Sequence, residues 1–352
     1  MAVNSETRTF DQILSTTYDY YRPVLVDNIF KMSALFYKMY SGGKVEHQDG
    51  GASLIFPLMY GDNDTAAWYS DDETIDTNVQ DGISVAKMPW TQLAASIAFT
   101  RKQRRMNSGK SQIINLITAK IRQAEMTLYE TFNDAMYGMG KYNDSQTSKA
   151  VCGLGAMVSP DPESYDVGGI DCSTYTWFKN KVRGNASANF TWIDDSDAPT
   201  LATGPVAMRD LYAWCSKGTG GPPDFGLASL AGYNGYEEYM ATRQIYRDPD
   251  MGKMGFDNIR FRNITLFWDE SCKTENISAS SGLTANGEIF YFLNTNFMNM
   301  KVDSQTDFIR TEFKRPVNQD SEAALILWMG NWCTTKRSKH GIMENYNSTN
   351  VT

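Results

Sequence analysis

The sequence predicts an α+β fold in which helices and strands are interspersed without a regular βαβ rhythm. Two strand-like segments, Leu54–Tyr60 and Ser84–Thr100, flank a long polar stretch, and an amphipathic helix at about 107–137 follows them directly. Shorter segments with helical and strand patterns occur in the second half of the chain. Because a two-stranded ribbon is marginal in water by itself, we expect this chain to complete its core with copies of itself.

The composition is globular and excludes several classes of function. The 352 residues are 41% hydrophobic and 21% charged, enough for one large domain or two or three smaller ones. The net charge of −8 argues against an electrostatic nucleic-acid binder, so a chain that meets nucleic acid would surround it rather than grip it. The first residues lack a signal-peptide pattern, and no apolar run reaches membrane-spanning length, so we expect no membrane contact.

The cysteine pattern argues against a zinc site and against a disulfide framework. The number of cysteines is odd, their spacings are wide, and no CxxC pair occurs. We therefore expect five free thiols in a reducing compartment. They are Cys152, Cys172, Cys215, Cys272 and Cys333.

The first 50 residues are mixed in pattern. Phe10–Leu14 and Val24–Tyr40 are each predicted to hold a helical segment, and Pro23 divides them. The second of these segments has apolar residues at helical spacing, and the glycine pair at 42–43 ends it.

The stretch Gly61–Gly82 between the two predicted strands is acidic and rich in turn residues, yet it carries Trp68 and Tyr69. Two large aromatic side chains at the end of an exposed loop would leave apolar surface in water. They either fold back on the ribbon or contact a neighbouring subunit, and we expect the second. The acidic residues Asp71, Asp72 and Glu73 follow them directly.

The predicted helix at about 107–137 has apolar residues every three or four positions. Ser108 and Ser111 supply capping side chains at its start, and Gly138 and Gly140 end it. At 1.5 Å per residue it would be a rod of about 45 Å. Acidic residues lie in its C-terminal half and oppose the helix dipole, so packing must hold it.

The second half of the chain is predicted as short alternating elements. These are a short exposed segment at Thr174–Lys181, helices at Pro205–Ser216 and Gly235–Tyr246, and strands at Ile259–Asp269, Gly287–Leu293, Phe308–Phe313 and Ala323–Thr334. The tryptophans in this half are expected to lie in the core rather than to form a ligand platform. They include Trp177, Trp268, Trp328 and Trp332.

No pattern in the sequence supports catalysis or a cofactor. The stretch NSGKS at 107–111 precedes a helix as a phosphate-binding loop would, but the required earlier glycine is replaced by Arg104. Neither His47 nor His340 lies near a plausible nucleophile in the sequence. The carboxylates of the acidic loop could in principle take calcium, but their spacing does not match a calcium loop, so we expect no metal. Those carboxylates belong to Asp62, Asp64, Asp71 and Asp72.

A cluster of basic residues precedes the predicted long helix. Its members are Arg101, Lys102, Arg104, Arg105 and Lys110. The cluster could be a solvated face, a contact with the acidic residues of a neighbour's loop, or a contact with the DNA backbone. We single out Arg101, Arg104 and Arg105 as candidate intersubunit residues, together with the aromatic and acidic residues of the loop.

Six segments in this order resemble the major capsid proteins of tailed bacteriophages, which have the HK97-type shell fold. They are FPLMYGDNDTAAWYS (56–70), SGKSQIINLITAKIRQAEMTL (108–128), GGIDCSTYTWFKN (168–180), GFDNIRFRNITLFWDE (255–270), YFLNTNFMNMKV (291–302) and ILWMGNWCTTKRSKHGIM (326–343). The resemblance covers most of the chain. Each motif is structural rather than catalytic, so the specificity lies in the ensemble.

The resemblance implies a domain organisation. Residues 1–50 would be an N-terminal arm, and residues 51–100 an extended β-hairpin loop lying over a neighbouring subunit. Residues 101–165 and 301–352 would form a peripheral domain with the spine helix at about 107–137. Residues 166–300 would form an axial domain around the five- and six-fold centres.

The resemblance also implies a function. The chain would be a structural protein that assembles into hexamers and pentamers of an icosahedral head around double-stranded DNA, in a virion built in the host bacterial cytoplasm. Expected partners are other copies of the chain, a portal protein at one vertex, and separate scaffold and decoration proteins. Family-like sequence starts close to residue 1, so no scaffolding segment is expected within the chain. Lys87 has no evident match for the isopeptide cross-linking of some relatives, so none is expected here.

Two other functions stay open at the level of sequence. One is a phosphate-handling enzyme that uses the GKS turn, for which Lys110→Ala would abolish nucleotide binding. The other is a related shell that encloses enzymes instead of DNA, which nuclease-protected DNA inside the particles would exclude.

Overall fold

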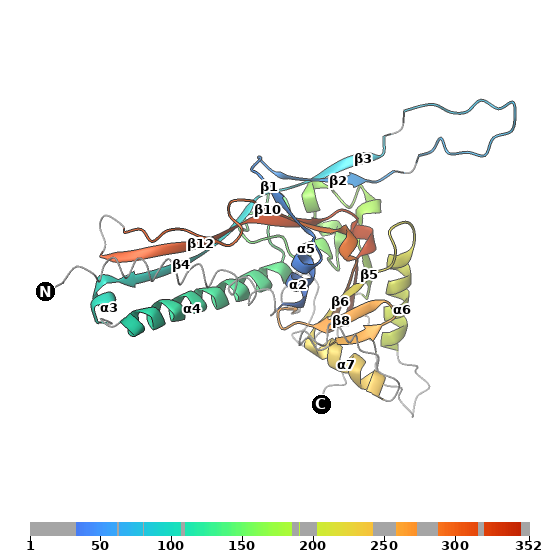
Figure 1. Cartoon of the computed structure of the whole chain (residues 1–352). Coiled ribbons are helices and arrows are strands. Elements are labelled where there is room, and N and C mark those ends of the chain that lie inside the picture. Colours follow the sequence, from blue (N-terminus) through green and yellow to red (C-terminus); the bar gives the residue numbers. More distant parts are fainter. Residues whose placement is uncertain are drawn as a thin grey trace.

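The computed structural model describes residues 33–61, 63–79, 81–106, 110–184, 190, 203–241, 258–272, 288–315 and 320–345. The side chains of 104–106 and 110–119 lie outside this description. Strands of the described chain form a five-stranded sheet, a six-stranded sheet and a two-stranded ribbon. Helices lie among and beside these sheets (Figure 1), so the predicted α+β class is confirmed.

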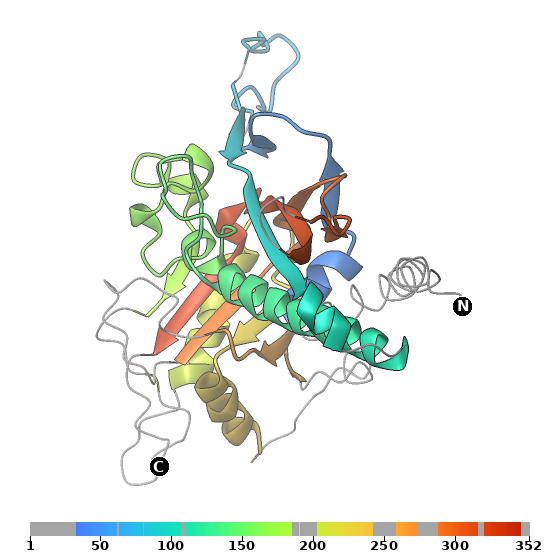
Figure 2. The ribbon, with the colours of Figure 1, turned by 90° about the vertical axis from the view of Figure 1, so that its left-hand side faces the viewer.

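Two strands of the five-stranded sheet, together with α4, form an elongated arm of the molecule (Figure 1). β4 (Thr91–Thr100) pairs antiparallel with β12 (Ser321–Thr334) over ten residues, and α4 (Lys110–Tyr137) runs alongside both (Figures 1 and 2). The Phe132 ring of α4 meets the edge of the Trp328 ring of β12 at a centroid distance of 4.8 Å. This apolar contact supplies the packing that the unfavourable helix charges require.

Three further strands complete this sheet. β10 (Met298–Asp303) pairs with the C-terminal half of β12, β1 (Val45–Gln48) pairs parallel with β10, and β11 (Ile309–Arg310) pairs with the middle of β12. α2 (Ala34–Ser41) precedes β1, and the Ser33 hydroxyl caps it by accepting from the Phe36 N–H. Residues 33–48 are therefore part of the body, which differs from an arm over 1–50, and residues 1–32 lie outside the description.

The six-stranded sheet forms the second part of the core. Its order is β5 (Lys181–Arg183), β13 (Gly341–Asn345), β9 (Glu288–Leu293), β6 (Phe225–Ala228), β8 (Ile264–Trp268) and β7 (Asn258–Phe261). Every residue of β9 is buried, as a central strand covered on both faces requires. α6 (Thr203–Ser216) and α7 (Leu230–Ala241) pack against this sheet (Figure 1). β13 therefore lies with the six-stranded sheet, although the prediction grouped 301–352 with the long helix.

The ribbon consists of β2 (Leu54–Met59) and β3 (Ile83–Met88), with Leu54 opposite Met88 and Met59 opposite Ile83. Burial alternates strictly along β2, so one face of the ribbon packs on the body and the other faces solvent. The chain between the two strands extends away from the body as a long loop (Figure 1).

The remaining helices are short. They are α3 (Arg101–Met106), α5 (Leu154–Met157) and the 3-10 turns η1 (Pro162–Ser164), η2 (Val167–Gly169), η3 (Thr176–Phe178), η6 (Thr295–Phe297) and η7 (Arg337–Lys339).

Several predicted boundaries are wrong. The predicted strand Ser84–Thr100 is two strands, because the chain leaves the ribbon at Pro89 and Trp90 and enters the five-stranded sheet. The predicted strand Ile259–Asp269 is the hairpin β7–β8, turned at Arg262 with a φ of 52°. The helix predicted at Gly235–Tyr246 begins five residues earlier, and its last predicted residues, 242–246, lie outside the description.

The predictions for single aromatic residues are mixed. Trp328 and Trp332 are buried as predicted, whereas Trp268 is 40% exposed and is not a core residue. The segment Thr174–Lys181, predicted to be exposed, contains the turn η3 and the fully buried Phe178. The five cysteines are all free, as predicted, and all five are buried.

Candidate intersubunit surfaces

Exposed apolar side chains concentrate on the ribbon and on the loop between its strands. Among the described residues, nine of the fifteen exposed large apolar side chains lie there. They are Ile55, Met59, Tyr60, Trp68, Tyr69, Ile75, Val79, Ile83 and Val85. A concentration of this kind marks an interaction surface. We call residues 60–82 the projecting loop.

The projecting loop holds Trp68 and Tyr69 away from the rest of the chain. The Trp68 side chain is fully exposed and Tyr69 is 68% exposed, so neither folds back on the ribbon. The exposed residues Asp71, Asp72 and Glu73 follow in a turn, in which the Ser70 N–H donates to the Glu73 carboxylate at 3.1 Å. Apolar and acidic surface therefore lie side by side near the loop tip.

The base of the ribbon is fixed to the body. The Tyr60 ring stacks on the Trp177 ring of η3, with centroids 5.2 Å apart and planes at 21°. The Lys301 Nζ of β10 donates to the Ile55 carbonyl at 2.7 Å and lies 4.9 Å from the centre of the Phe56 ring. These contacts set the direction in which the projecting loop leaves the molecule.

One glycine brings the body into close contact with the ribbon. Gly168 of η2 has a φ of 66°, and a Cβ there would lie 2.6 Å from the Ala86 Cβ of β3. Only glycine combines this backbone conformation with this approach.

The predicted basic residues lie at the other end of the molecule. α3 stands at the far end of the elongated arm, and the projecting loop extends from the opposite side of the body (Figure 1). The Arg101 guanidinium is 3.9 Å from the Asp320 carboxylate, and both side chains are more than half exposed. The backbones of Arg104 and Arg105 continue α3, and their side chains lie outside the description, as does that of Lys110. The candidate basic residues of α3 and the candidate acidic residues of the projecting loop are therefore not in contact within one chain.

The sequence around His340 is rich in basic residues, yet three of its side chains are buried. Arg337, Lys339 and His340 are each at most 1% exposed. The Arg337 guanidinium donates to four backbone carbonyls and to the Cys172 Sγ, and Lys339 Nζ donates to two more carbonyls. No pattern in the sequence predicts this burial, because a run of basic residues is ordinarily solvated.

His340 is held neutral. Its Nδ1 accepts from the Asn294 N–H at 3.2 Å, so the proton is on Nε2, which lies 2.7 Å from the Thr334 hydroxyl. Burial, and then the nearby Arg337 charge, lower the pKa of His340 to about 3. His47 lies 3.3 Å from the Asp307 carboxylate at the surface. Within the described chain, His340 bonds to Asn294 and Thr334 and His47 to Asp307, so neither histidine is paired with a serine or cysteine side chain.

The other candidate chemistry of the sequence is not assembled in the described chain. Across the described residues no three metal-ligating side chains come together, and Asp62 is not among those residues. Residues 107–109 of the NSGKS stretch also lie outside the description. No helix in the described parts of the chain is both long and apolar enough to cross a bilayer.

Solved structures of viral and related shells have the same arrangement of elements. The chain superimposes on the capsid asymmetric unit of cyanophage A-1(L) with a TM-score of 0.56 and 12% identity, over 87% of this chain and 91% of that one. This is the HK97-type capsid fold. No protein-family model matches the sequence, and no curated protein matches it.

Two further structures support the HK97-type assignment. A chain of Gordonia phage Cozz aligns with a TM-score of 0.50 and 8% identity, over 88% of this chain and 87% of that one. A chain from the capsid of an empty GTA particle aligns with a TM-score of 0.50 and 12% identity, over 88% and 90%. The HK97-type fold that the sequence resemblance predicted is therefore confirmed.

Proposed function

We propose that the chain is a major capsid protein that assembles into hexamers and pentamers of an icosahedral bacteriophage head around double-stranded DNA. The concentration of exposed apolar side chains on the ribbon and its projecting loop carries the proposal, and the HK97-type fold supports it. The role is structural, without catalysis. The chain would reside in the virion after assembly in the host cytoplasm.

Burial of the apolar side chains of the projecting loop would favour association between copies of the chain. Burying an aromatic side chain such as Trp68 removes about 150–250 Å² from water, at about 25 cal/mol per Å². In a ring each copy gives its loop to one neighbour and receives the loop of another, so one such contact forms per copy. Entropy lost on association offsets part of the gain, so many weak contacts rather than one strong contact would stabilise the shell.

The positions of the acidic and basic residues favour a head-to-tail contact between copies of the chain. The acidic turn at Asp71, Asp72 and Glu73 and the basic helix α3 lie on opposite sides of the body (Figure 1). Contacts between unlike surfaces of identical chains are head-to-tail, and such contacts form rings when the rotation from one copy to the next closes on itself. Hexamers and pentamers are rings of this kind. A portal protein at one vertex and separate scaffold and decoration proteins complete the proposed set of partners.

The enclosed cargo separates this function from a compartment that holds enzymes. Particles made together with the packaging genes would be treated with nuclease, and the nucleic acid that survives would be extracted and sized. The proposal predicts protected double-stranded DNA of uniform length. Shells that protect protein cargo but no DNA would contradict it.

A further inference from the structure

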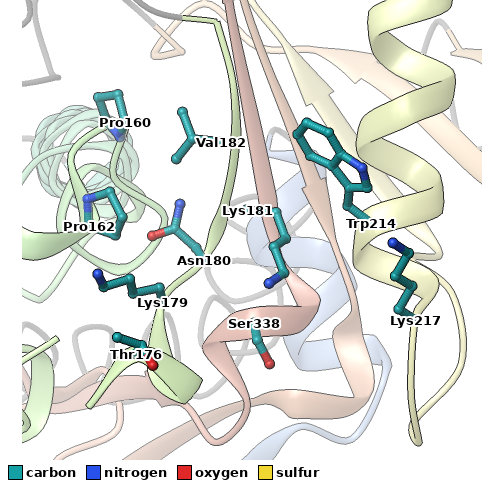
Figure 3. Close-up of a pocket in the computed structure, with 10 residues that line it drawn as sticks. All are labelled: Pro160, Pro162, Thr176, Lys179, Asn180, Lys181, Val182, Trp214, Lys217 and Ser338. Carbon is teal, nitrogen blue, oxygen red and sulfur yellow. The ribbon is translucent and has the colours of Figure 1, made fainter. Parts of the chain in front are cut away.

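A groove beside the six-stranded sheet has features that shell formation does not use. Its volume is about 600 Å³, within the range of ligand sites. It lies between the loop that precedes η1, the turn η3, the strand β5 and the end of α6 (Figure 3). The residues that line it include Lys179, Asn180, Lys181, Val182, Trp214 and Lys217.

The groove runs along an open strand edge. Successive side chains of a strand point to opposite faces, and the successive β5 residues Lys181 and Val182 both line the groove, so the groove follows the edge of β5. β5 is the last strand of the six-stranded sheet and pairs only with β13 among the described strands. The Lys181 N–H donates to the His340 carbonyl on that side at 2.9 Å. In a parallel pair the next residue therefore directs its N–H and C=O to the opposite edge, so those of Val182 face the groove.

The charges at the groove are positive. Lys179 pairs with Glu163, whereas the structure gives no ion pair to Lys181 or Lys217 among the described residues. Trp214 presents an aromatic surface between them, and the Arg183 guanidinium lies 5.6 Å from the centre of its ring. None of the described residues that line the groove is acidic.

A buried acceptor at the groove lacks a donor. Asn180 is 4% exposed, and its amide nitrogen donates to the Ser159 carbonyl at 2.7 Å. Its Oδ1 has no hydrogen-bond partner within the described chain. A buried carbonyl oxygen without a donor costs free energy, so a ligand with an N–H at this point would be stabilised.

We propose that this groove binds an extended acidic peptide of another protein, which adds as a strand to β5. The peptide backbone would pair with Val182, a peptide N–H would donate to Asn180 Oδ1, and its carboxylates would meet Lys181 and Lys217. A phosphate ligand would satisfy the lysines but has no N–H for Asn180. The proposal concerns a surface away from the projecting loop and does not depend on shell assembly.

Binding is measured by fluorescence polarisation with the full-length chain. The probe is a fluorescein-labelled pentapeptide that alternates glutamate and valine, and the comparison peptide has lysine in place of glutamate. The acidic peptide should bind more weakly as salt increases, and the basic one should not bind. The absence of acidic-peptide binding at about 1 mM, equivalent to about −4 kcal/mol, would overturn the proposal.

A matched pair of variants locates the site. Lys217 and Lys149 are both exposed, and only Lys217 lines the groove. Lys217→Glu should weaken the acidic peptide about tenfold, equivalent to about 1.4 kcal/mol, whereas Lys149→Glu should leave its affinity unchanged. Equal losses in the two variants would mean that net charge rather than the groove attracts the peptide, which contradicts the proposal.

Two further arms test the binding mode. N-methylation of the peptide nitrogens one at a time should abolish binding at alternate positions, since alternate N–H groups of a strand face its neighbour. Tolerance of methylation at every position would overturn strand addition. Labelled decathymidylate that binds as tightly as the peptide, and loses affinity in Lys217→Glu, would instead assign the groove to nucleic acid.

Discussion

At the scale of residues, the buried cation of Arg337 is a central structural feature. Its guanidinium has no carboxylate partner in the described chain and is satisfied instead by the carbonyls of Ala156, Met157, Pro162 and Tyr165. These carbonyls belong to the segment between α4 and β5, whose helical structure is limited to the four-residue α5 and short 3-10 turns. The planar fork of five donors therefore holds a loop region that has little regular structure of its own.

Arg337→Lys should lower the free energy of unfolding by about 2–4 kcal/mol, because an ammonium reaches fewer of these carbonyls and leaves the others buried without donors. Urea unfolding of the unassembled chain measures this. Arg315→Lys is the matched control, since Arg315 pairs with Glu322 at 2.6 Å while being 51% exposed and should lose less than about 1 kcal/mol. Similar losses for the two variants would contradict the role given to Arg337.

His340 gives the folded chain a dependence on pH. Its pKa is about 3 in the folded chain, below the ordinary value of 6.5. Its contribution to stability is therefore complete above pH 6.5 and is lost as the pH falls towards 3. Between pH 6.5 and 4.5 this loss amounts to about 2–3 kcal/mol.

Urea midpoints of the unassembled chain at a series of pH values measure this loss. The decline should be shallower in His340→Gln than in the wild type and unchanged in His47→Gln, whose residue is exposed. A wild-type slope in His340→Gln would mean that carboxylates alone cause the decline.

At the scale of elements, helices and strands with a regular apolar spacing can be predicted from the sequence. Turns that depend on contacts with distant residues cannot. The long helix, the ribbon and β9 follow from apolar spacing. The hairpin β7–β8 was predicted as one strand because alternation continues through its turn. There Arg262 takes a left-handed conformation usual for glycine, and its guanidinium lies 5.0 Å from the centre of the Tyr212 ring.

Among the candidate surfaces too, those within one segment of the sequence could be predicted, and those that join distant segments could not. Trp68 and Tyr69 stood out because aromatic residues are unusual in an acidic loop. The groove at β5 could not be predicted, since it joins residues about 180 positions apart, such as Pro160 and Ser338. The burial of Lys339 and His340 likewise depends on strands that meet only in the folded chain.

The contact between Tyr60 and Trp177 predicts how the ribbon is held. Trp177→Ala should increase amide hydrogen exchange in β2 and β3 by about tenfold, since a stacked aromatic pair contributes about 0.5–1.5 kcal/mol beyond its buried area. Exchange in β9 should not change. Trp268→Ala makes the same change at a 40% exposed tryptophan of β8 and serves as the control, since it should leave exchange in the ribbon unchanged. Equal exchange in the ribbon of Trp177→Ala and the wild type would show that the stack does not hold it.

At the scale of the whole molecule, one side presents apolar and acidic surface on a loop, and the far end presents basic residues on α3 (Figure 1). A single chain cannot bring them together. This separation favours contact between copies, and it makes the loop and α3 separately testable.

The Trp68→Ala/Tyr69→Ala double variant should fold as the wild type does, because both side chains are exposed, and should form fewer or less stable shells. Particle yield by sedimentation and the heat stability of the particles measure this. Leu230→Ala removes a 53% exposed apolar side chain elsewhere and should assemble normally. Unchanged yield and stability in the double variant would remove the loop from the interface.

Charge reversal tests the basic end. Arg104→Glu/Arg105→Glu should impair assembly, and the loss should be partly recovered when Asp71 and Asp72 are changed to lysine in the same chain. Lys149→Glu is the control for a change of net charge. Normal assembly of the arginine variant would leave α3 as a solvated face.

The central claim is that this chain forms shells, and particle size tests it most directly. The full-length chain would be expressed alone and with its neighbouring genes, then measured by light scattering and negative-stain electron microscopy. The account predicts closed shells, tubes or six-fold rings. A monomer of 39.6 kDa under both conditions, without assembly on crowding or change of salt, would contradict it.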